Sequence, residues 1–136
     1  MHHVQQILAA HPRPNGEDVA LLAEAAGALG ECALACVACA DACLGEDHVA
    51  ELRRCVRTCL DCADICAITA RMAVRRTEPN AALSRGQIET CLAACHACAA
   101  ECHKHASMHE HCRACGEACR HCEGLCRQVV ERAAAA

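Results

Sequence analysis

The stretch that decides the fold is Cys32-Ala-Leu-Ala-Cys36-Val-Ala-Cys39-Ala-Asp-Ala-Cys43, in which cysteines follow the spacing C-x3-C-x2-C-x3-C. At about 100° per residue, offsets of 0, 4, 7 and 11 fall within about 60° of a helix surface. A strand has a period of two and would scatter the same residues over both faces. The stretch therefore predicts a helix with a stripe of sulfur along one side.

The same spacing recurs further along the chain. A second block holds Cys55, Cys59, Cys62 and Cys66, and a third holds Cys91, Cys95, Cys98 and Cys102. A fourth block carries five, namely Cys112, Cys115, Cys119, Cys122 and Cys126, and spans about 80° of helix surface. Four matching blocks predict four helices that share a cysteine face.

Turn signals separate the blocks. Pro12 and Pro14 precede the first, Gly45 follows it, and Thr77-Glu78-Pro79-Asn80 separates the second from the third. Helices are expected at about 17–44, 47–76, 81–106 and 109–134, after a short N-terminal helical segment. Short connections make neighbours antiparallel. The expected fold is an all-α, up-down four-helix bundle with a cysteine-lined lumen, in one domain over residues 1–136.

Composition rules out an ordinary core. The 136 residues are 54% hydrophobic, but they include 17 Cys and no Phe, Tyr or Trp. Such cysteine content is typical of secreted disulfide scaffolds. However, the N-terminus has no Lys or Arg before Arg13, and its apolar run is too short for a signal peptide. We therefore expect a cytosolic protein, in which thiols bind metal or take part in catalysis.

Several partners and activities are disfavoured by the same sequence. The formal net charge is −4 and there are no aromatic side chains to stack on bases, so nucleic acid is not expected as a partner. No run approaches about 18 consecutive apolar residues, so no membrane span is expected. A thiol oxidoreductase would place C-x-x-C at a helix N-terminus, whereas these pairs fall within helices. We therefore do not expect an enzyme.

Three explanations can account for the cysteine stripes. Cysteine can act as a small buried apolar residue, but four matching stripes would bury little area for so many residues. Disulfides within a stripe are excluded, because Cβ atoms three or four residues apart on a helix lie about 5–6 Å from each other, whereas a disulfide needs about 3.8 Å. Disulfides between helices remain possible in air. Metal binding accounts for all of the features.

Cu(I) is the metal that the pattern favours. Thiolate is a soft ligand, and Cu(I) accepts two or three such ligands, which one helix or facing helices can supply. If each thiolate bridges two ions, the capacity is about one Cu(I) per Cys. The alternative is a general thiolate buffer for Zn(II) or Cd(II), which would share the fold and the ligands. Zinc, however, prefers closed sites of four ligands.

The two ends of the expected bundle differ in composition. At one end of the bundle, which we call the histidine end, the first helix leads to the second and the third helix leads to the fourth. This end holds Cys43, His48, Cys55, Cys102, His105, Met108, His109, His111 and Cys112. The distal end gathers an apolar plug of Leu21, Leu22, Leu29, Ile68, Val74, Leu83, Ile88, Val129 and Val130. His105 and His109 project close to the stripe of Cys102, and we infer that copper enters at the histidine end.

The sequence resembles the cytosolic branch of the bacterial copper storage proteins. The resemblance rests on the four stripes and on Cys39-Ala-Asp-Ala-Cys43-Leu-Gly-Glu-Asp, Leu60-Asp-Cys-Ala-Asp-Ile-Cys66 and His105-Ala-Ser-Met-His-Glu-His-Cys-Arg-Ala-Cys115. It implies Cu(I) storage and detoxification on the cysteines, with His105, His109 and His111 as further ligands, and a homotetramer. A copper chaperone is a candidate partner, and the sequence leaves open whether delivery needs one. Asp61 matches a family aspartate, but its projection allows only an outer role. Met108 projects onto the stripe of Cys112 but departs from the pattern of the cytosolic branch, so it is also assigned an outer role.

An oligomer is also expected from the residues themselves. Six apolar side chains project roughly 100–160° away from their stripes: Leu34, Val37, Leu44, Val56, Leu60 and Leu92. A bundle with sulfur inside leaves such side chains outside, where another copy of the chain can cover them.

Overall fold

The computed structural model describes residues 2–13 and 18–135 and is helical throughout its regular parts. The elements are α1 (His2–Ala9), α2 (Val19–Leu44), the 3-10 turn η1 (Val49–Leu52), α3 (Arg53–Ala73), α4 (Ala81–His103) and α5 (Glu110–Ala135). Within these ranges there is no strand. The expected start of the first long helix at residue 17, and the breaker Pro14, lie outside the described residues.

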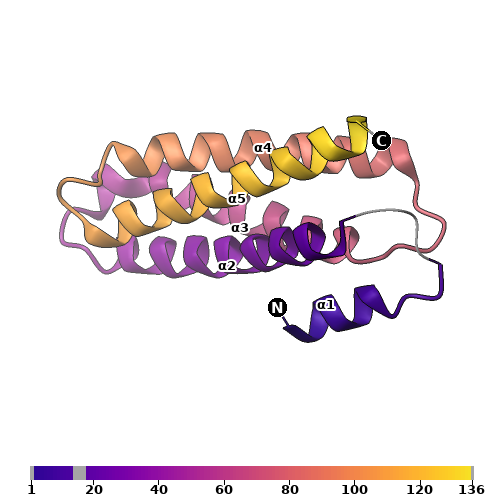
Figure 1. The fold of residues 1–136 in the computed structure, drawn as a ribbon. Helices are drawn as coiled ribbons and strands as arrows, with labels where there is room; N and C mark the ends of the chain where they lie inside the picture. Colours follow the sequence, from indigo (N-terminus) through magenta and orange to yellow (C-terminus); the bar gives the residue numbers. More distant parts are fainter. Residues whose placement is uncertain (1, 14–17, 136) are drawn as a thin grey trace.

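The four long helices form an up-down bundle, as predicted (Figure 1). α2 packs against α3 and α5, and α4 packs against the same two helices. The hairpins between α2 and α3 and between α4 and α5 lie together at the left of the view, while the α3–α4 connection lies at the opposite end. The first two form the histidine end and the last forms the distal end.

Side-chain caps begin two of the helices where the sequence changes from turn to helix. The Asp18 carboxylate accepts a hydrogen bond from the Leu21 amide at 3.0 Å, and the Asn80 side chain accepts one from the Leu83 amide at 3.0 Å. These caps satisfy amides that have no partner within the helix. The turn before Asn80 contains Glu78 at φ 49. The breakers therefore separate α3 from α4 as expected.

The loops differ from the predicted helix bounds. α3 begins at Arg53 after η1 rather than near residue 47, and it ends at Ala73 rather than 76. α4 ends at His103 rather than 106, because the Lys104 amide turns back to the carbonyls of Glu101 and Cys102. The chain from 104 to 109 is a turn. Positions projected from α4 beyond residue 103 therefore lose their helical register.

α2 is long and apolar enough to cross a membrane, by length and composition only, with a mean hydropathy of 1.6. The count of consecutive apolar residues did not reveal this, because Glu and Asp interrupt the run while Ala and Cys raise the average. Within the bundle, 56% of that stretch is buried. Burial of this kind is what a core helix of a bundle shows, and α2 contributes four buried cysteines to the core.

The expected apolar plug at the distal end is only partly present. Leu21, Leu22 and Leu29 are buried, but Ile68 and Leu83 are exposed, as is Val130 to a smaller degree. Their helix faces point outward, and a cavity that is partly lined by polar side chains occupies the end of the bundle instead. α1 packs beside this end, where Leu8 contacts a cluster with Leu22 and Ala23.

The outer surface carries most of the apolar side chains that the helical projection placed there. Leu34 is 75% exposed, and Val37, Leu44 and Leu60 are exposed as well. Val56 and Leu92 are half-buried and pack against the core. Four of the six residues are therefore available on the outside of a single chain.

Candidate metal centre

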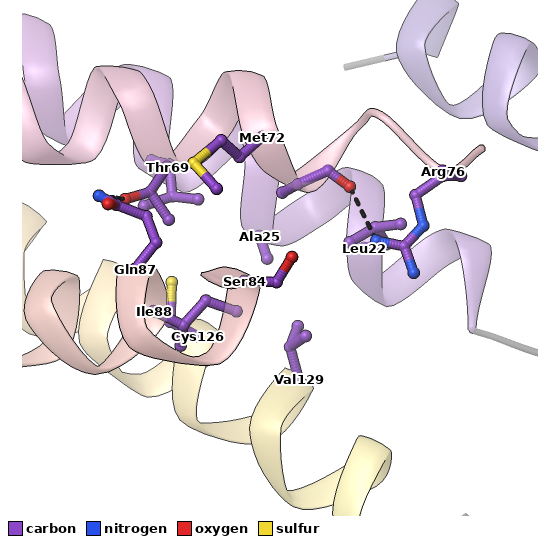
Figure 2. A pocket seen from close by; sticks show the side chains of 12 residues that line it. Leu22, Ala25, Thr69, Met72, Arg76, Ser84, Gln87, Ile88, Cys126 and Val129 are labelled. Atoms are coloured by element: carbon purple, nitrogen blue, oxygen red, sulfur yellow. Dashed lines mark hydrogen bonds between the residues drawn. The ribbon is translucent and has the colours of Figure 1, made fainter. Parts of the chain in front are cut away.

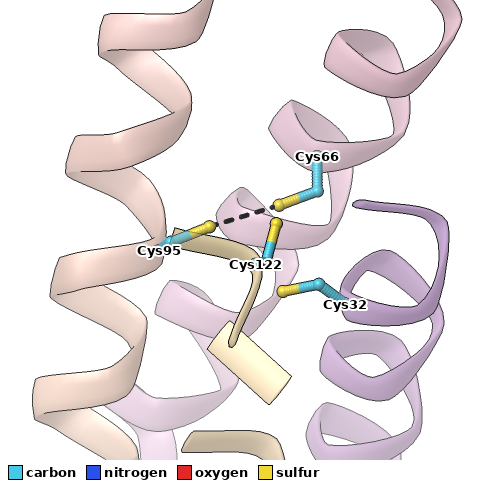
Figure 3. Close-up of side chains that lie close together, drawn as sticks. All are labelled: Cys32, Cys66, Cys95 and Cys122. Carbon is cyan, nitrogen blue, oxygen red and sulfur yellow. Dashed lines mark hydrogen bonds between the residues drawn. The ribbon is translucent and has the colours of Figure 1, made fainter. Parts of the chain in front are cut away.

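All 17 cysteines lie inside the bundle, and none is more than 3% exposed. Each is a free thiol. Some of their sulfurs form levels in which each of the four helices contributes one cysteine. Figure 3 shows one such level, with the sulfurs of Cys32, Cys66, Cys95 and Cys122 converging from α2, α3, α4 and α5. A second level contains Cys39, Cys59, Cys102 and Cys115.

The levels are joined into a continuous column. Cys36 lies between them on α2, and its sulfur is 3.8 Å from that of Cys98 and 3.7 Å from that of Cys119. Neighbouring sulfurs along the column are typically 3.6–3.9 Å apart, as for Cys66 with Cys95 and Cys55 with Cys102. These separations are far longer than the roughly 2.05 Å of a disulfide bond. A soft ion can bridge sulfurs at such distances.

Groups that could hold a metal share their members. Cys32, Cys36 and Cys119 occur together with Cys62, while Cys36 and Cys119 also occur with Cys98 and Cys115. In each group, all ligand atoms lie within 4.8 Å of one another. A closed four-thiolate zinc site needs its own set of ligands. Overlapping groups instead favour thiolates that bridge several ions, as Cu(I) allows.

Burial keeps two thiols at the histidine end, Cys43 and Cys112, protonated. Burial is the largest cause and the neighbouring Cys55 the second, and together they raise the pKa of Cys43 to about 11 and that of Cys112 to about 12. Thiolate charge is costly in a low-dielectric interior unless a cation compensates for it. Each Cu(I) that binds therefore displaces protons and supplies the compensating charge.

His111 is the histidine that contacts the thiols most closely. Its Nδ1 lies 3.4 Å from the Cys39 sulfur and 3.6 Å from that of Cys112. Cys39, Cys43, His111 and Cys112 form one of the candidate ligand groups. The group mixes soft sulfur with an imidazole nitrogen at the histidine end of the column.

Glu46 fixes the orientation of this ring. His111 Nε2 lies 3.0 Å from a Glu46 carboxylate oxygen, and His109 Nδ1 lies 2.7 Å from the same oxygen. The rings of His109 and His111 are stacked, with centroids 5.4 Å apart. The hydrogen bond from His111 lowers the pKa of the Glu46 carboxyl. With its Nε2 proton held by Glu46, His111 presents Nδ1 to the sulfurs.

His105 and His109 lie at the same end but bond to carboxylates. His105 Nε2 is 3.2 Å from a carboxylate oxygen of buried Glu101, which also pairs with Lys104 and Arg54. Helical projection singled out His105 and His109 because it extended α4 beyond residue 103. The turn at 104–109 changes that register and brings His111, at the start of α5, to the thiols. No periodic signal marked Glu46 or Glu101.

The two residues assigned outer roles lie away from the column. The Asp61 carboxylate is on the outside of α3 and bonds to Arg57 at 3.2 Å. Met108 is 79% exposed in the turn between α4 and α5. Asp61 and Met108 therefore lie on the outside of the bundle rather than among the thiols.

The fold and site define a class of protein: a helical bundle whose core is a column of free thiols suited to many soft metal ions. The sequence model described as copper storage protein matches residues 19–131. The chain therefore belongs to the copper storage protein family. A search of curated proteins found no match.

Solved structures agree with this assignment. The copper storage protein of Streptomyces lividans loaded with 10 copper equivalents is 44% identical with a TM-score of 0.92, over 94% of this chain and 98% of that one. The five-copper structure of a cytosolic copper storage protein from the same organism is 47% identical with a TM-score of 0.80, over 82% and 92%. A variant with one histidine replaced by alanine is 45% identical with a TM-score of 0.83, over 86% and 98%.

Proposed function

We propose that this protein stores Cu(I) in the cytosol, with about one ion per cysteine, and thereby also protects the cell from free copper. The single observation that carries the proposal is the continuous column of 17 buried free thiols. Cu(I) bound by two or three bridging thiolates matches overlapping groups of sulfur. The proposed metal ligands are the 17 cysteines together with His111, with His105 and His109 as further ligands at the histidine end.

Anaerobic titration tests the storage proposal. Cu(I) added to the reduced protein should be taken up until about one ion per cysteine is bound, whereas Zn(II) should stop near one ion per four thiolates. A chelator that absorbs visible light only when it binds Cu(I) shows when added copper is no longer taken up by the protein. Saturation at four or fewer Cu(I) ions, or a zinc capacity equal to that of copper, would contradict the proposal.

We further propose that copper enters at the histidine end. Support comes from the contact of His111 with two thiols and from the half-exposed carboxylate of Glu46 beside it. A copper chaperone is the proposed donor. If a small Cu(I) complex loads the protein as fast as a Cu(I)-bound chaperone does, that part of the proposal fails.

The proposed assembly is a homotetramer. The exposed residues Leu34, Val37, Leu44 and Leu60 on α2 and α3 support contact with other copies of the chain. Light scattering on the reduced protein tests this. A mass equal to one 14.4 kDa chain would contradict any oligomer, and a dimer mass would contradict the tetramer.

A further inference from the structure

The thiol column ends unevenly at the distal end. Cys91 on α4 and Cys126 on α5 extend one level beyond the group of Cys32, Cys66, Cys95 and Cys122, and they lie beside each other and beside Cys122. On α2 and α3, Leu29 and Thr69 stand at this end of the column, lining the same cavity as Cys126. Of all the cysteines, Cys126 keeps the largest exposed fraction, 3%.

Cys126 borders a cavity of about 60 Å³ between the four helices. Figure 2 shows its walls, with Leu22 and Ala25 from α2, Met72 from α3, Gln87 and Ile88 from α4, and Val129 from α5. A water molecule needs about 10–15 Å³ of such space, so the cavity has room for water or for an ion. It leads from the surface to the last thiol of the column.

Polar side chains line part of this cavity where an apolar plug would have closed it. The Thr69 hydroxyl is buried and donates to the Ile65 carbonyl at 2.7 Å, and Gln87 Nε2 donates to the same hydroxyl at 2.9 Å. Ser84 and the partly desolvated Arg76 also contribute to the wall. Most of the remaining wall is apolar, so these polar groups give the cavity a few places at which water can bind.

Met72 adds a second soft donor to the same cavity. Its thioether sulfur lines the wall on α3, across the cavity from Cys126 on α5 (Figure 2). A thioether is a soft ligand for Cu(I), and it carries no proton that must be lost. A neutral, weaker ligand next to a thiolate is suited to a site that binds an ion briefly and then releases it to other ligands. The other wall residues are oxygen, nitrogen or carbon groups that do not compete for Cu(I).

We propose that the distal cavity is a second access route for Cu(I), in which Met72 and Cys126, backed by Cys91, hold the ion at the end of the column. The inference rests on the proposed storage function and deepens it, because it gives the column a second opening. Passage is a ligand exchange in which copper stays Cu(I). When the Cys126 thiol binds the ion, its proton goes to water in the cavity, and the reverse step returns a proton to the thiol.

Met72→Leu is the variant that tests this route, because it keeps the side-chain volume and removes the sulfur. Met108→Leu makes the same change at an exposed position at the histidine end and serves as the matched control. Each variant is loaded anaerobically to saturation and mixed with excess bicinchoninate in a stopped-flow instrument. Crystals of the loaded wild type and loaded Met72→Leu proteins are measured at the copper edge for anomalous scattering.

We expect one phase of copper withdrawal to slow by about tenfold in Met72→Leu, which corresponds to a barrier higher by about 1.4 kcal/mol. Total capacity should stay within about one ion of the wild type, and Met108→Leu should behave as the wild type does. An anomalous peak bonded to Met72 Sδ should be present in the wild type and absent in the variant. Unchanged withdrawal rates, or the lack of that peak in the wild type, would overturn the second route while leaving storage intact. Failure of the wild type to fill its cysteines would instead overturn the storage function.

Discussion

At the scale of single residues, one carboxylate oxygen of Glu46 contacts the imidazoles of both His109 and His111. Glu46 holds His111 by Nε2 at 3.0 Å, so that Nδ1 faces the sulfurs of Cys39 and Cys112. Partners of this kind set the tautomer and the direction of a metal-binding histidine. Glu46 itself does not touch the thiols and acts through the ring.

Replacement of Glu46 is therefore expected to weaken the first step of loading. Glu46→Ala should lower the affinity for the first Cu(I) by about tenfold, the lower end of the range for such partners. His111→Ala should lower it at least as much. Competition for one equivalent of Cu(I) with a coloured chelator measures the effect. Glu51→Ala, at an exposed acid of the adjacent turn, is the control, and equal affinities for both glutamate variants would contradict the role of Glu46.

The buried thiols predict how the stability of the apoprotein depends on pH. Burial raises the pKa of Cys43 to about 11 and that of Cys112 to about 12, from 9.0. Between pH 9 and these values the unfolded chain has lost protons that the folded chain retains, so the free energy of unfolding falls as pH rises. Below pH 9 both states hold the protons and this contribution is fully present.

Anaerobic thermal unfolding between pH 7 and pH 11 checks this expectation. The melting temperature of the apoprotein should fall across the upper part of that range. The copper-loaded protein should change much less, because its thiols have already given up their protons to copper. An apoprotein whose stability rises with pH would contradict the assignment of neutral thiols.

At the scale of helices, α4 and α5 approach each other closely at Gly116. A Cβ added there would lie 3.5 Å from the Cβ of Cys102 and 3.7 Å from the Ala99 carbonyl oxygen. A methyl group fits at such distances, but a longer side chain does not. The spacing of these two helices therefore depends on a small residue at position 116.

Gly116→Ala should be neutral or stabilising, because alanine favours a helix over glycine by about 0.5–1 kcal/mol. Gly116→Leu should destabilise the bundle by about 1–3 kcal/mol through overpacking. Gly124 on the same helix has open space around it, so Gly124→Leu is the matched control and should not destabilise. Anaerobic urea unfolding gives the values. Similar losses for both leucine variants would show that helix spacing is not the cause.

The helices are also the scale at which sequence reasoning was most successful. The offsets of Cys32, Cys36, Cys39 and Cys43 predict one buried face, and all four side chains are buried. The period is a local property and persists as long as the helix does. The turn at 104–109 has no period, so the placement of His111 and the carboxylates of Glu46 and Glu101 depended on tertiary contacts that spacing does not encode. Helical projection of apolar positions does not reveal the cavity beside Thr69 and Gln87, because its polar wall residues follow no apolar period.

At the scale of the whole molecule, association between copies of the chain is expected to depend on the apolar residues on the outside of α2 and not on its buried cysteines. Leu34 and Val37 lie one turn apart and are both exposed. Leu34→Glu combined with Val37→Glu should lower the solution mass to that of a single chain without changing copper capacity, because charge on an apolar contact opposes association. Light scattering and titration of the same sample test both statements. Ala93→Glu with Ala97→Glu, on the exposed face of α4, is the control.

The exchange of thiol protons for copper has a consequence for how the outside of the protein changes as it fills. If each Cu⁺ replaces one proton, the formal net charge stays at −4 whether the column is empty or full. The surface potential, and with it the forces that govern solubility and long-range attraction, then stays constant over the whole range of loading. Empty and full protein should migrate together on a native gel at neutral pH. Any partner that distinguishes them must therefore sense the ends of the bundle rather than its charge.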